Sequence, residues 1–163
     1  DFMVTDPKTG WMVTNPSSSP ENWYLIDNQP KLALSMASAM DIQLTRNLFR
    51  DCIQACKILD MDPLMQKQME DVLPKLPPHQ IGKYGQLQEW FFDFDEEDPK
   101  HRHMSHLFAF YPDDDITIYK NPDLTRAVEN VLKRKDDKYL GWSGAWKINL
   151  YPYGDMILKV IIM

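Results

Sequence analysis

Proline positions constrain this chain more strongly than any other feature of its sequence. Twelve prolines are spread over 163 residues, and each fixes φ and removes a backbone donor, which interrupts a helix interior. Asp62-Pro63 and Asn121-Pro122 pair a capping residue with a proline at the first helical position, which is typical of helix starts. Pro74 ends the first of these helices. The chain is therefore expected to form successive helices joined by long loops.

Apolar residues recur at helical spacing in five parts of the chain. The predicted helices cover residues 38–59, 62–73, 104–111, 121–132 and 142–150. One short strand is expected around residues 11–14, and no segment alternates between apolar and polar residues for long enough to predict a larger sheet. The sequence predicts a mainly α domain over residues 1–163, irregular over 1–30 and helical over 31–163.

The composition indicates a folded protein and argues against nucleic-acid binding. Apolar residues make up 44% of the chain, and five Trp, seven Tyr and seven Phe supply large side chains for a core. The net charge is −6 and the basic residues are scattered, so nucleic acid is not an expected partner. No apolar run reaches the roughly 20 residues of a membrane-spanning helix. The N-terminus has neither an initiator Met nor a signal peptide, so we expect an interior piece of a longer protein or a processed chain.

A proline-bounded loop, Thr14 to Asn22, carries a single carboxylate, that of Glu21. Two prolines stiffen a run of small hydroxyl side chains, so the loop is expected to hold its side chains in set directions. A glutamate on such a loop suits a positioned catalytic acid. The alternative is structural: Ser19 or Asn22 caps a following turn, and Glu21 accepts hydrogen bonds from its free N–H groups. The residues alone leave both interpretations open.

Three of the four histidines lie within six residues, His101 to His106, with Arg102 between the first two. Imidazoles bind zinc, and His103 and His106 stand three apart, as ligands on one helix face do. Arginine and imidazole donors also suit a site for a sugar or an anion. A buried polar cluster at a helix start is the structural alternative. No ligand-spaced Cys or paired Asp accompanies the histidines, which argues against the metal site.

Two further motifs combine aromatic and polar residues. Residues 80–90 hold two glycines whose spacing matches no phosphate-binding loop, followed by a Gln-Leu-Gln-Glu-Trp run that ends at Trp90. Amides for hydroxyls and an indole for an apolar sugar face make this run typical of a carbohydrate-facing surface. In residues 141–147, two tryptophans four apart share one helical face, which suits core packing as well as ligand stacking. Together the motifs favour a polar pocket with aromatic walls.

Taken in order, these motifs resemble the catalytic domain of glycoside hydrolase family 95, the 1,2-α-L-fucosidases and their relatives. The matching segments are Asp6 to Trp11, Asn15 to Asn22, Met40-Asp41, Gln80 to Trp90, His101 to Leu107, Tyr111-Pro112, and Gly141-Trp142-Ser143 with Ala145-Trp146-Lys147. Each segment is weak evidence alone, but their shared order over roughly residues 1–150 makes the set specific.

The resemblance implies part of an (α/α)6 barrel, an inverting mechanism and no metal or other cofactor. Such enzymes use one carboxylic acid to protonate the leaving oxygen and one carboxylate to activate water on the opposite face of the sugar. Glu21 matches the family's general acid, in its Ser-Pro-Glu motif. The expected substrate-binding residues are Arg102, His103, His106, Trp90 and Asn22. The first two match positions that hold fucose hydroxyls, and the others are expected to support the pocket.

The sequence departs from the family pattern in ways that bear on activity. The family's general base is an aspartate in a Gln-Ile-Asp-Gly-Asn motif, which is absent from these 163 residues, and the asparagines that position the water precede residue 1 in the pattern. Where the family has Tyr-Pro-Gly, this chain has Tyr111-Pro112-Asp113. We therefore expect the acid half of an inverting site, inactive by itself, whose partner is the rest of the catalytic domain.

The expected function is hydrolysis of terminal α-1,2-linked L-fucose, or of the related L-galactose, from glycans. The resemblance implies an extracellular or periplasmic compartment. Two alternatives stay open. A non-catalytic remnant would bind carbohydrate weakly through Arg102, His103 and Trp90, or would be an inactive fragment. A His-cluster metalloprotein would hold stoichiometric zinc instead.

Overall fold

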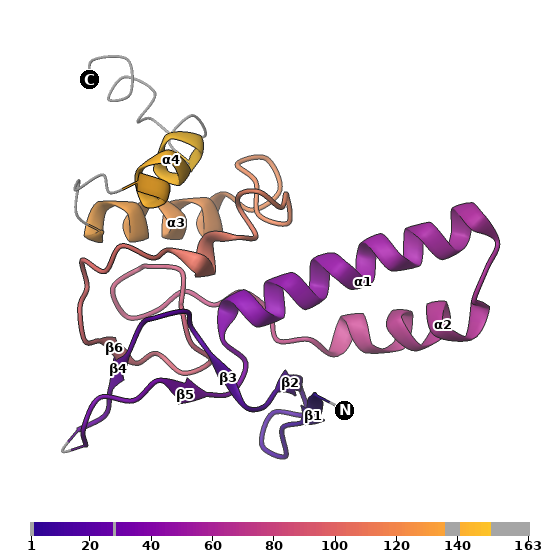
Figure 1. Cartoon of the computed structure of the whole chain (residues 1–163), viewed down its shortest axis with the longest axis horizontal. Coiled ribbons are helices and arrows are strands. Elements are labelled where there is room, and N and C mark those ends of the chain that lie inside the picture. The colour runs from indigo at the N-terminus through magenta and orange to yellow at the C-terminus, as the bar shows by residue number, and fades with distance from the viewer. Residues whose placement is uncertain (1, 28, 136–140, 151–163) are drawn as a thin grey trace.

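The computed structural model describes residues 2–27, 29–135 and 141–150, and the rest of the predicted domain lies outside the described residues. An antiparallel pair of helices extends from one side of the molecule, and a second pair lies at the other end (Figure 1). Short strands and long loops make up the remainder. The loops therefore form much of the body from which the first pair projects.

The chain is mainly α, as its periodicity predicts. The α-helices are α1 (Ala39–Leu59), α2 (Pro63–Val72), α3 (Pro122–Arg134) and α4 (Gly141–Leu150). Two short 3-10 helices, η1 (Leu73–Lys75) and η2 (Ser105–Leu107), lie between them. Four of the five predicted helices are confirmed, each within two residues of its expected ends. None of the described helices combines the length and the apolar character that spanning a membrane requires.

The helix starts follow the proline signals more closely than the capping signals. The Ser38 hydroxyl accepts a 3.4 Å hydrogen bond from the Asp41 N–H at the start of α1. Pro63 and Pro122 begin α2 and α3, as predicted. The Asp62 side chain makes no capping bond, because its left-handed φ of 52° differs from the extended backbone of a capping residue. A fixed φ is a local property of proline, so it survives in the fold where a side-chain cap does not.

In the described ranges, six short strands form three antiparallel pairs. They pair β1 (Met3–Thr5) with β2 (Met12–Thr14), β3 (Ser17–Ser18) with β5 (Leu34–Ser35), and β4 (Tyr24–Leu25) with β6 (Asp95–Glu96). The strand expected at residues 11–14 is thus confirmed as β2. Within the other pairs, Ser17 stands opposite Ser35 and Tyr24 opposite Glu96. The loop that carries Glu21 is therefore fastened on both sides.

The helix predicted over residues 104–111 is wrong. The chain forms η2 there and then a series of turns. Gln43, on α1, accounts for the difference, because its side chain pairs with two backbone groups that an α-helix would pair internally. Its Oε1 accepts from the Ala109 N–H at 2.9 Å, and its Nε2 donates to the His106 carbonyl at 2.7 Å. A tertiary contact thus replaces the local helix and holds this segment against α1.

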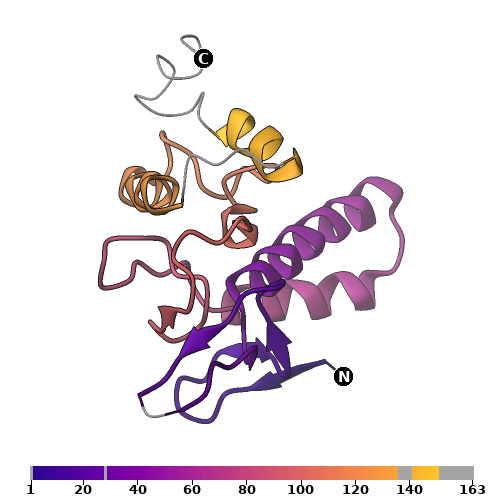
Figure 2. The ribbon, with the colours of Figure 1, turned by 60° about the vertical axis from the view of Figure 1, so that its left-hand side comes forward.

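Two buried apolar clusters form the core. The larger one joins α3 and α4 to the segments around Leu87 and Leu107, and the smaller one joins β2 and α1 to Leu76 and Phe91. The long connection between α2 and α3 contributes to both clusters and lies between the strands and α3 (Figure 2). Residues 76–121 of this connection contain no α-helix. Loops rather than helices therefore link the two parts of the core.

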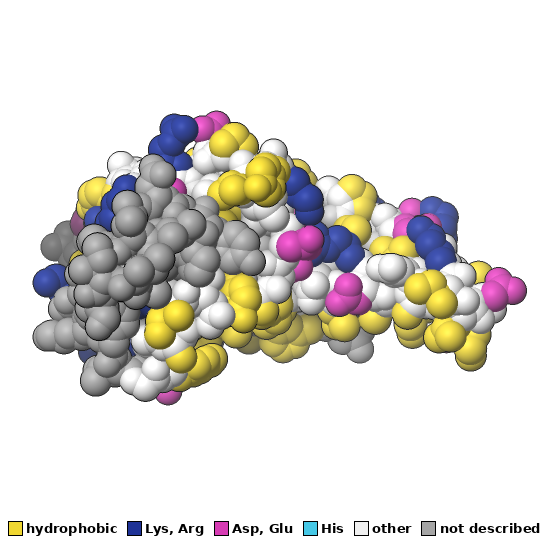
Figure 3. Space-filling model, turned by 90° about the horizontal axis from the view of Figure 1, so that it is seen from above, with side chains coloured by type: hydrophobic (Ala, Val, Ile, Leu, Met, Phe, Trp, Pro, Cys, Tyr) yellow, Lys and Arg dark blue, Asp and Glu magenta, His cyan; other side chains and the backbone are white. Residues whose placement is uncertain are grey.

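The α1–α2 pair exposes apolar side chains along its length (Figure 3). Those more than half exposed are Leu48, Ile58, Leu59, Met61, Leu64 and Met65. Isolated apolar side chains are common on protein surfaces, but several on one helix pair favour packing against a further element. Among the described residues, nothing covers these side chains.

Candidate active site

An open cleft of about 820 Å³ lies between the loop of Glu21, the segment that follows Arg102, and α4. Its lining includes Pro20, Met40, Arg102, His103, Phe108, Tyr111, Trp142 and Trp146. Aromatic rings dominate this wall, and Arg102 and His103 supply its basic groups. A cleft with an apolar wall and a few convergent polar groups is typical of a ligand site.

Glu21 follows Pro20, which lines this cleft, but Glu21 itself is not among the lining residues. Its backbone has a left-handed φ of 54°, which is uncommon for a residue with a side chain. The side chain is 60% exposed and forms an ion pair with Arg102. The Nε2 atom of His103 lies 3.7 Å from the same carboxylate. The structure thus brings together three residues that the sequence predicts as a site, although Glu21 and Arg102 are 81 positions apart.

His103 is oriented by the loop itself. Its Nδ1 atom lies 3.1 Å from the Pro20 carbonyl oxygen, and because a carbonyl only accepts, Nδ1 carries the hydrogen. Nε2 therefore faces the Glu21 carboxylate. His101 packs edge-on against the His103 ring with centroids 5.0 Å apart. Burial, followed by the charge of His103, lowers the pKa of His101, so His101 is neutral at pH 7.

A buried carboxylate, Glu89, holds the loop from behind. Glu89 is 5% exposed, and its Oε1 accepts hydrogen bonds from the Ser19 hydroxyl at 2.5 Å and from the Asn22 side-chain amide at 3.0 Å. The Ser19 hydroxyl also lies 3.2 Å from that of Ser105. The Ser19 hydroxyl bonds to Glu89 rather than capping a turn, whereas the Asn22 Oδ1 does accept from the next backbone N–H, that of Trp23, at 3.0 Å. Ser19 and Asn22 stand on either side of Glu21 and fix its loop.

The other oxygen of Glu89 faces buried nitrogen atoms. Its Oε2 lies 3.5 Å from the His106 Nδ1 and 3.9 Å from the Lys135 Nζ, and Lys135 also pairs with Glu96 at 2.5 Å. Burial, and after it the positive charge of Lys135, lowers the pKa of His106 to about 3. His106 is therefore neutral at pH 7, and Lys135 balances the two carboxylates.

Helix α4 is joined to the opposite side of the cleft by a hydrogen bond of 2.7 Å from the Ser143 hydroxyl to the Arg102 carbonyl. Trp142 is 76% exposed, and its ring lies parallel to that of Trp146, with centroids 5.9 Å apart and 5° between the planes. The Trp146 indole N–H donates to the Tyr111 carbonyl at 3.1 Å. Trp146 is thereby held in place, and Trp142 adds an open aromatic ring to the cleft wall.

The sequence of this chain matches the glycosyl hydrolase family 95 catalytic domain over residues 1–153. The chain belongs to glycosyl hydrolase family 95. It is 39% identical over 146 residues to alpha-L-fucosidase 2 of Arabidopsis thaliana. The aligned region covers 88% of this chain and 17% of that protein. It is also 30% identical over 148 residues to the probable alpha-fucosidase A of Aspergillus niger. Here the aligned region covers 86% of this chain and 18% of that protein. The chain thus spans less than a fifth of the length of these curated relatives.

Three residues predicted for the family 95 site lie behind the cleft wall. Asn22 and His106 are each 1% exposed, and Trp90 is 3% exposed. Asn22 and His106 face Glu89, whereas Trp90 packs against the ring of Tyr24 with centroids 5.5 Å apart. None of the three is among the described residues that line the cleft. A part for them in binding sugar stays a prediction for this family 95 chain.

Glu89 is the residue that sequence reasoning missed. Gln86, Gln88 and Glu89 are each 9% exposed or less and do not line the cleft, so a sugar-facing role for them, as for Trp90, stays a prediction. One signal was available: Glu89 is the single charged residue between Lys83 and Asp93. A lone charge in such a stretch is buried only with partners. The sequence does not reveal that those partners stand 70 and 67 positions earlier.

The histidine cluster divides between the cleft and the interior. His101 and His103 pack together near Glu21, whereas His106 turns towards Glu89. Among residues 2–27, 29–135 and 141–150, no group of three or more His, Cys, Asp or Glu side chains could hold a metal ion. The three imidazoles do not converge on one point. In this family 95 chain, the cluster serves a buried polar contact at one end and an open cleft at the other.

Proposed function

We propose that residues 1–163 hold the general-acid half of an inverting α-L-fucosidase site. One observation carries this proposal: Glu21, Arg102 and His103 meet at the edge of an open cleft in a family 95 chain. In an inverting glycosidase, an acid protonates the leaving oxygen while a carboxylate-activated water attacks the opposite face of the sugar. Glu21 is the acid in this proposal.

The proposed substrate is a glycan that ends in α-1,2-linked L-fucose, or in the related L-galactose. Arg102 offers a planar fork of N–H donors and His103 a ring nitrogen, and both suit sugar hydroxyls. Since the Arg102 and Glu21 side chains are 50% and 60% exposed, water screens their ion pair and a sugar hydroxyl can displace it. The neighbouring sugars of the glycan would pack their apolar faces against the exposed ring of Trp142.

We further propose that the helices are part of an (α/α)6 barrel that the full-length protein completes. Two features support it: α1 and α2 pack as an antiparallel pair, and their exposed apolar face has no covering among the described residues. Neighbouring helices of a barrel would cover that face. Asn22, His106 and Trp90, which lie behind the cleft, would support the sugar pocket from the inside.

The general base is proposed to lie outside residues 1–163. The Gln-Ile-Asp-Gly-Asn motif expected for it does not occur in this sequence. Without a base the attacking water is not activated, so we expect residues 1–163 alone to release no fucose. The family resemblance supports an extracellular or periplasmic place of action.

Fucose release from 2′-fucosyllactose tests the proposal at two levels. Residues 1–163 are expected to show no turnover, and turnover that Glu21→Gln abolishes would contradict the missing base. In the full-length family 95 protein, Glu21→Gln is expected to lower kcat by about 10²- to 10⁴-fold, the usual effect of losing a general acid. The matched control is Glu97→Gln, a partly exposed glutamate paired with Lys31, which should leave kcat within about twofold. Equal effects of the two substitutions would refute the role of Glu21.

A second candidate function is carbohydrate binding without catalysis. The exposed Trp142 beside Arg102 and His103 favours it, because such a cleft can bind sugar whether or not a base is present. Calorimetry with L-fucose on residues 1–163 should then give saturable binding that Arg102→Ala removes. If the unsubstituted chain does not bind L-fucose, residues 1–163 are an inert fragment. Stoichiometric zinc in the purified protein would support the His-cluster metalloprotein instead.

A further inference from the structure

We propose that Glu89 is a positioning residue that sets the direction of the Glu21 side chain. Glu89 does not touch the cleft, and it acts through the loop of Glu21. The effect on catalysis rests on the proposed function of Glu21, whereas the effect on the loop does not.

The geometry of the loop carries the proposal. Ser19 and Asn22 flank the two residues Pro20 and Glu21, and both side chains donate to the same Oε1 atom of Glu89. The Asn22 N–H also donates to the Ser19 carbonyl at 3.3 Å, which closes a turn. Glu21 holds a left-handed φ of 54° inside this turn. A conformation of that kind persists only where the surroundings impose it, and Glu89 supplies two of the constraints.

A carboxylate suits this position better than an amide does. An ionised carboxylate accepts at both oxygens, and its hydrogen bonds are shorter and stronger than those of a neutral group. Its charge is balanced by Lys135, whose Nζ lies 3.9 Å from Oε2, with the neutral ring of His106 at 3.5 Å on the same side. Glu89→Gln keeps the size of the side chain and removes the charge. This substitution therefore weakens both bonds to the loop without leaving a cavity.

The first experiment measures how firmly the loop is held in residues 1–163. A glutamate-specific endoprotease cleaves after Glu21, and it needs the loop to open from its turn. Glu89→Gln is expected to raise the rate of cleavage after Glu21 about tenfold, the change in open population that follows loss of a charge-assisted hydrogen bond. Glu97→Gln is the matched control and should leave that rate unchanged. An unchanged rate in Glu89→Gln, with far-ultraviolet circular dichroism like that of the parent chain, would overturn the proposal.

A second pair of variants covers the case in which Glu89→Gln fails to fold. Ser19→Ala removes one of the two loop donors, and Ser18→Ala removes the neighbouring hydroxyl, which is exposed. Faster cleavage after Glu21 in Ser19→Ala, and not in Ser18→Ala, supports the proposal that Glu89 holds the loop. Equal rates in these two variants would overturn it.

The second experiment separates positioning of an acid from general damage to the site. Fluoride leaves a sugar without protonation, whereas the alcohol of 2′-fucosyllactose requires an acid. In the full-length protein, Glu89→Gln is expected to lower kcat about 100-fold on 2′-fucosyllactose, the effect of roughly 1 Å of misplacement, and by only a few-fold on α-L-fucosyl fluoride. Equal losses on both substrates would overturn the positioning role. Full activity of Glu21→Gln on 2′-fucosyllactose would overturn the proposed function. The proteolysis would still show whether Glu89 holds the loop of Glu21.

Discussion

Two polar clusters join distant parts of this chain, one around Glu89 and the other around Arg50. Each connects segments more than sixty positions apart, and each is built from carboxylates and the groups that donate to them. They differ in what they connect and in how much of each side chain water reaches. That difference separates a cluster that displays a residue from one that fastens a fold.

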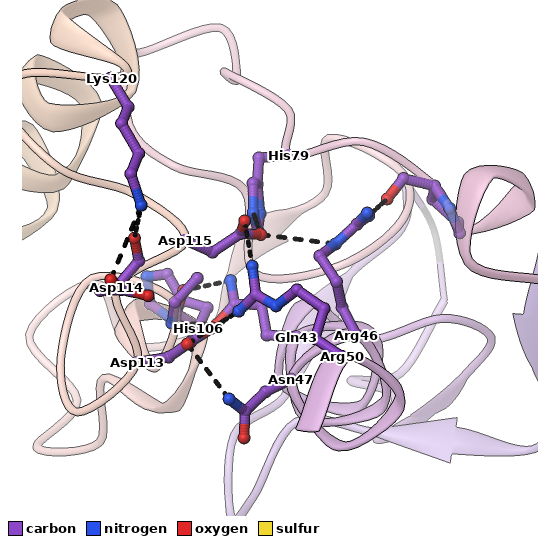
Figure 4. Close-up of polar contacts among 12 residues, drawn as sticks. Gln43, Arg46, Asn47, Arg50, His79, His106, Asp113, Asp114, Asp115 and Lys120 are labelled. Atoms are coloured by element: carbon purple, nitrogen blue, oxygen red, sulfur yellow. Dashed lines mark hydrogen bonds and ion pairs between the residues drawn. The ribbon is translucent and has the colours of Figure 1, made fainter. Parts of the chain in front are cut away.

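The Arg50 cluster fastens helix α1 to a loop that follows Pro112 (Figure 4). Arg50 donates to both oxygens of Asp113 at 2.8 Å and to Asp115 at 2.6 Å. The Nε2 atom of His79 lies 2.9 Å from Asp115. Each of these carboxylates faces a basic side chain of the same chain.

The same cluster gives Asp113 a structural role directly after Tyr111-Pro112. Asp113 is not among the residues with a left-handed φ, so its backbone does not require glycine. Its carboxylate accepts from Arg50 and, at 3.2 Å, from the side chain of Asn47. The aspartate therefore adds an attachment to α1 at no conformational cost.

The Glu89 cluster is buried more deeply and bonds to neutral donors. Whereas the side chain of Arg50 is 32% exposed, that of Lys135 is 1% exposed and that of Glu89 is 3% exposed. Its loop partners, Ser19 and Asn22, flank an exposed residue at the cleft. Carboxylates paired with an arginine thus join two elements of the fold, whereas the buried carboxylate of Glu89 holds the two ends of one exposed turn. Acid and substitution should therefore break the two clusters differently.

The largest expected effect is the acid sensitivity of the Glu89 cluster. The pKa of His106 is lowered to about 3 in the folded chain, so below pH 6.5 the unfolded chain binds a proton that the folded chain excludes. Stability from this group is complete above pH 6.5 and is lost as the pH falls towards 3, at up to about 1.4 kcal/mol per pH unit. Urea unfolding at pH 7, 5.5 and 4 should show this loss in the parent chain. His106→Gln should flatten it, and an identical slope in both proteins would contradict the prediction.

The next effect in size is the cost of opening the Arg50 cluster. Arg50→Met removes the guanidinium from Asp113, whose side chain is 4% exposed. Among the described side chains, the buried carboxylate then keeps the amide of Asn47 as its hydrogen-bond donor. The free energy of unfolding is expected to fall by about 3 kcal/mol, at the low end for a broken buried pair because Arg50 itself is partly exposed. The matched control is Lys120→Met, from the exposed pair with Asp114, which should change it by less than about 0.5 kcal/mol. If both substitutions lower the free energy of unfolding by a similar amount, the Arg50 cluster stabilises the fold no more than an exposed ion pair does.

The smallest expected effect is the acid response of the Arg50 cluster. Burial raises the pKa of Asp115, but the hydrogen bond and charge of His79, with Arg50 and Arg46, outweigh burial and lower the pKa to about 2. Because this folded pKa lies below the ordinary 3.8, the stability it contributes is present above pH 4 and is lost between pH 4 and 2. The loss amounts to about 2 kcal/mol, which Asp115→Asn should abolish in urea unfolding at pH 4 and 2.5. If the parent chain loses no stability until the pH falls below 4, the Arg50 cluster, and not the Glu89 cluster, would be the more acid-sensitive of the two.

The sequence predicted the helices that depend on local signals. α1, α2, α3 and α4 follow from apolar periodicity and from proline at helix starts, which act over a few residues. The helix predicted over residues 104–111 failed for a nonlocal reason, because Gln43 takes its backbone groups from a distant helix. Burial of the side chains of Gln86, Gln88 and Glu89 was not predicted, because polarity in a sequence does not show the direction of a side chain.

By itself, the sequence determined the mainly α character of this chain, its family, and the three residues that meet at the cleft. Glu21, Arg102 and His103 could be predicted because each lies in a motif that resembles the family pattern, and the motifs occur in the family's order. Only the tertiary structure decided that Glu89 holds the Glu21 loop and that Trp142 stays open to water. The physical reason is burial. A buried charge persists only beside donors, and Ser19 and Asn22 become its donors once the fold brings them within hydrogen-bond distance.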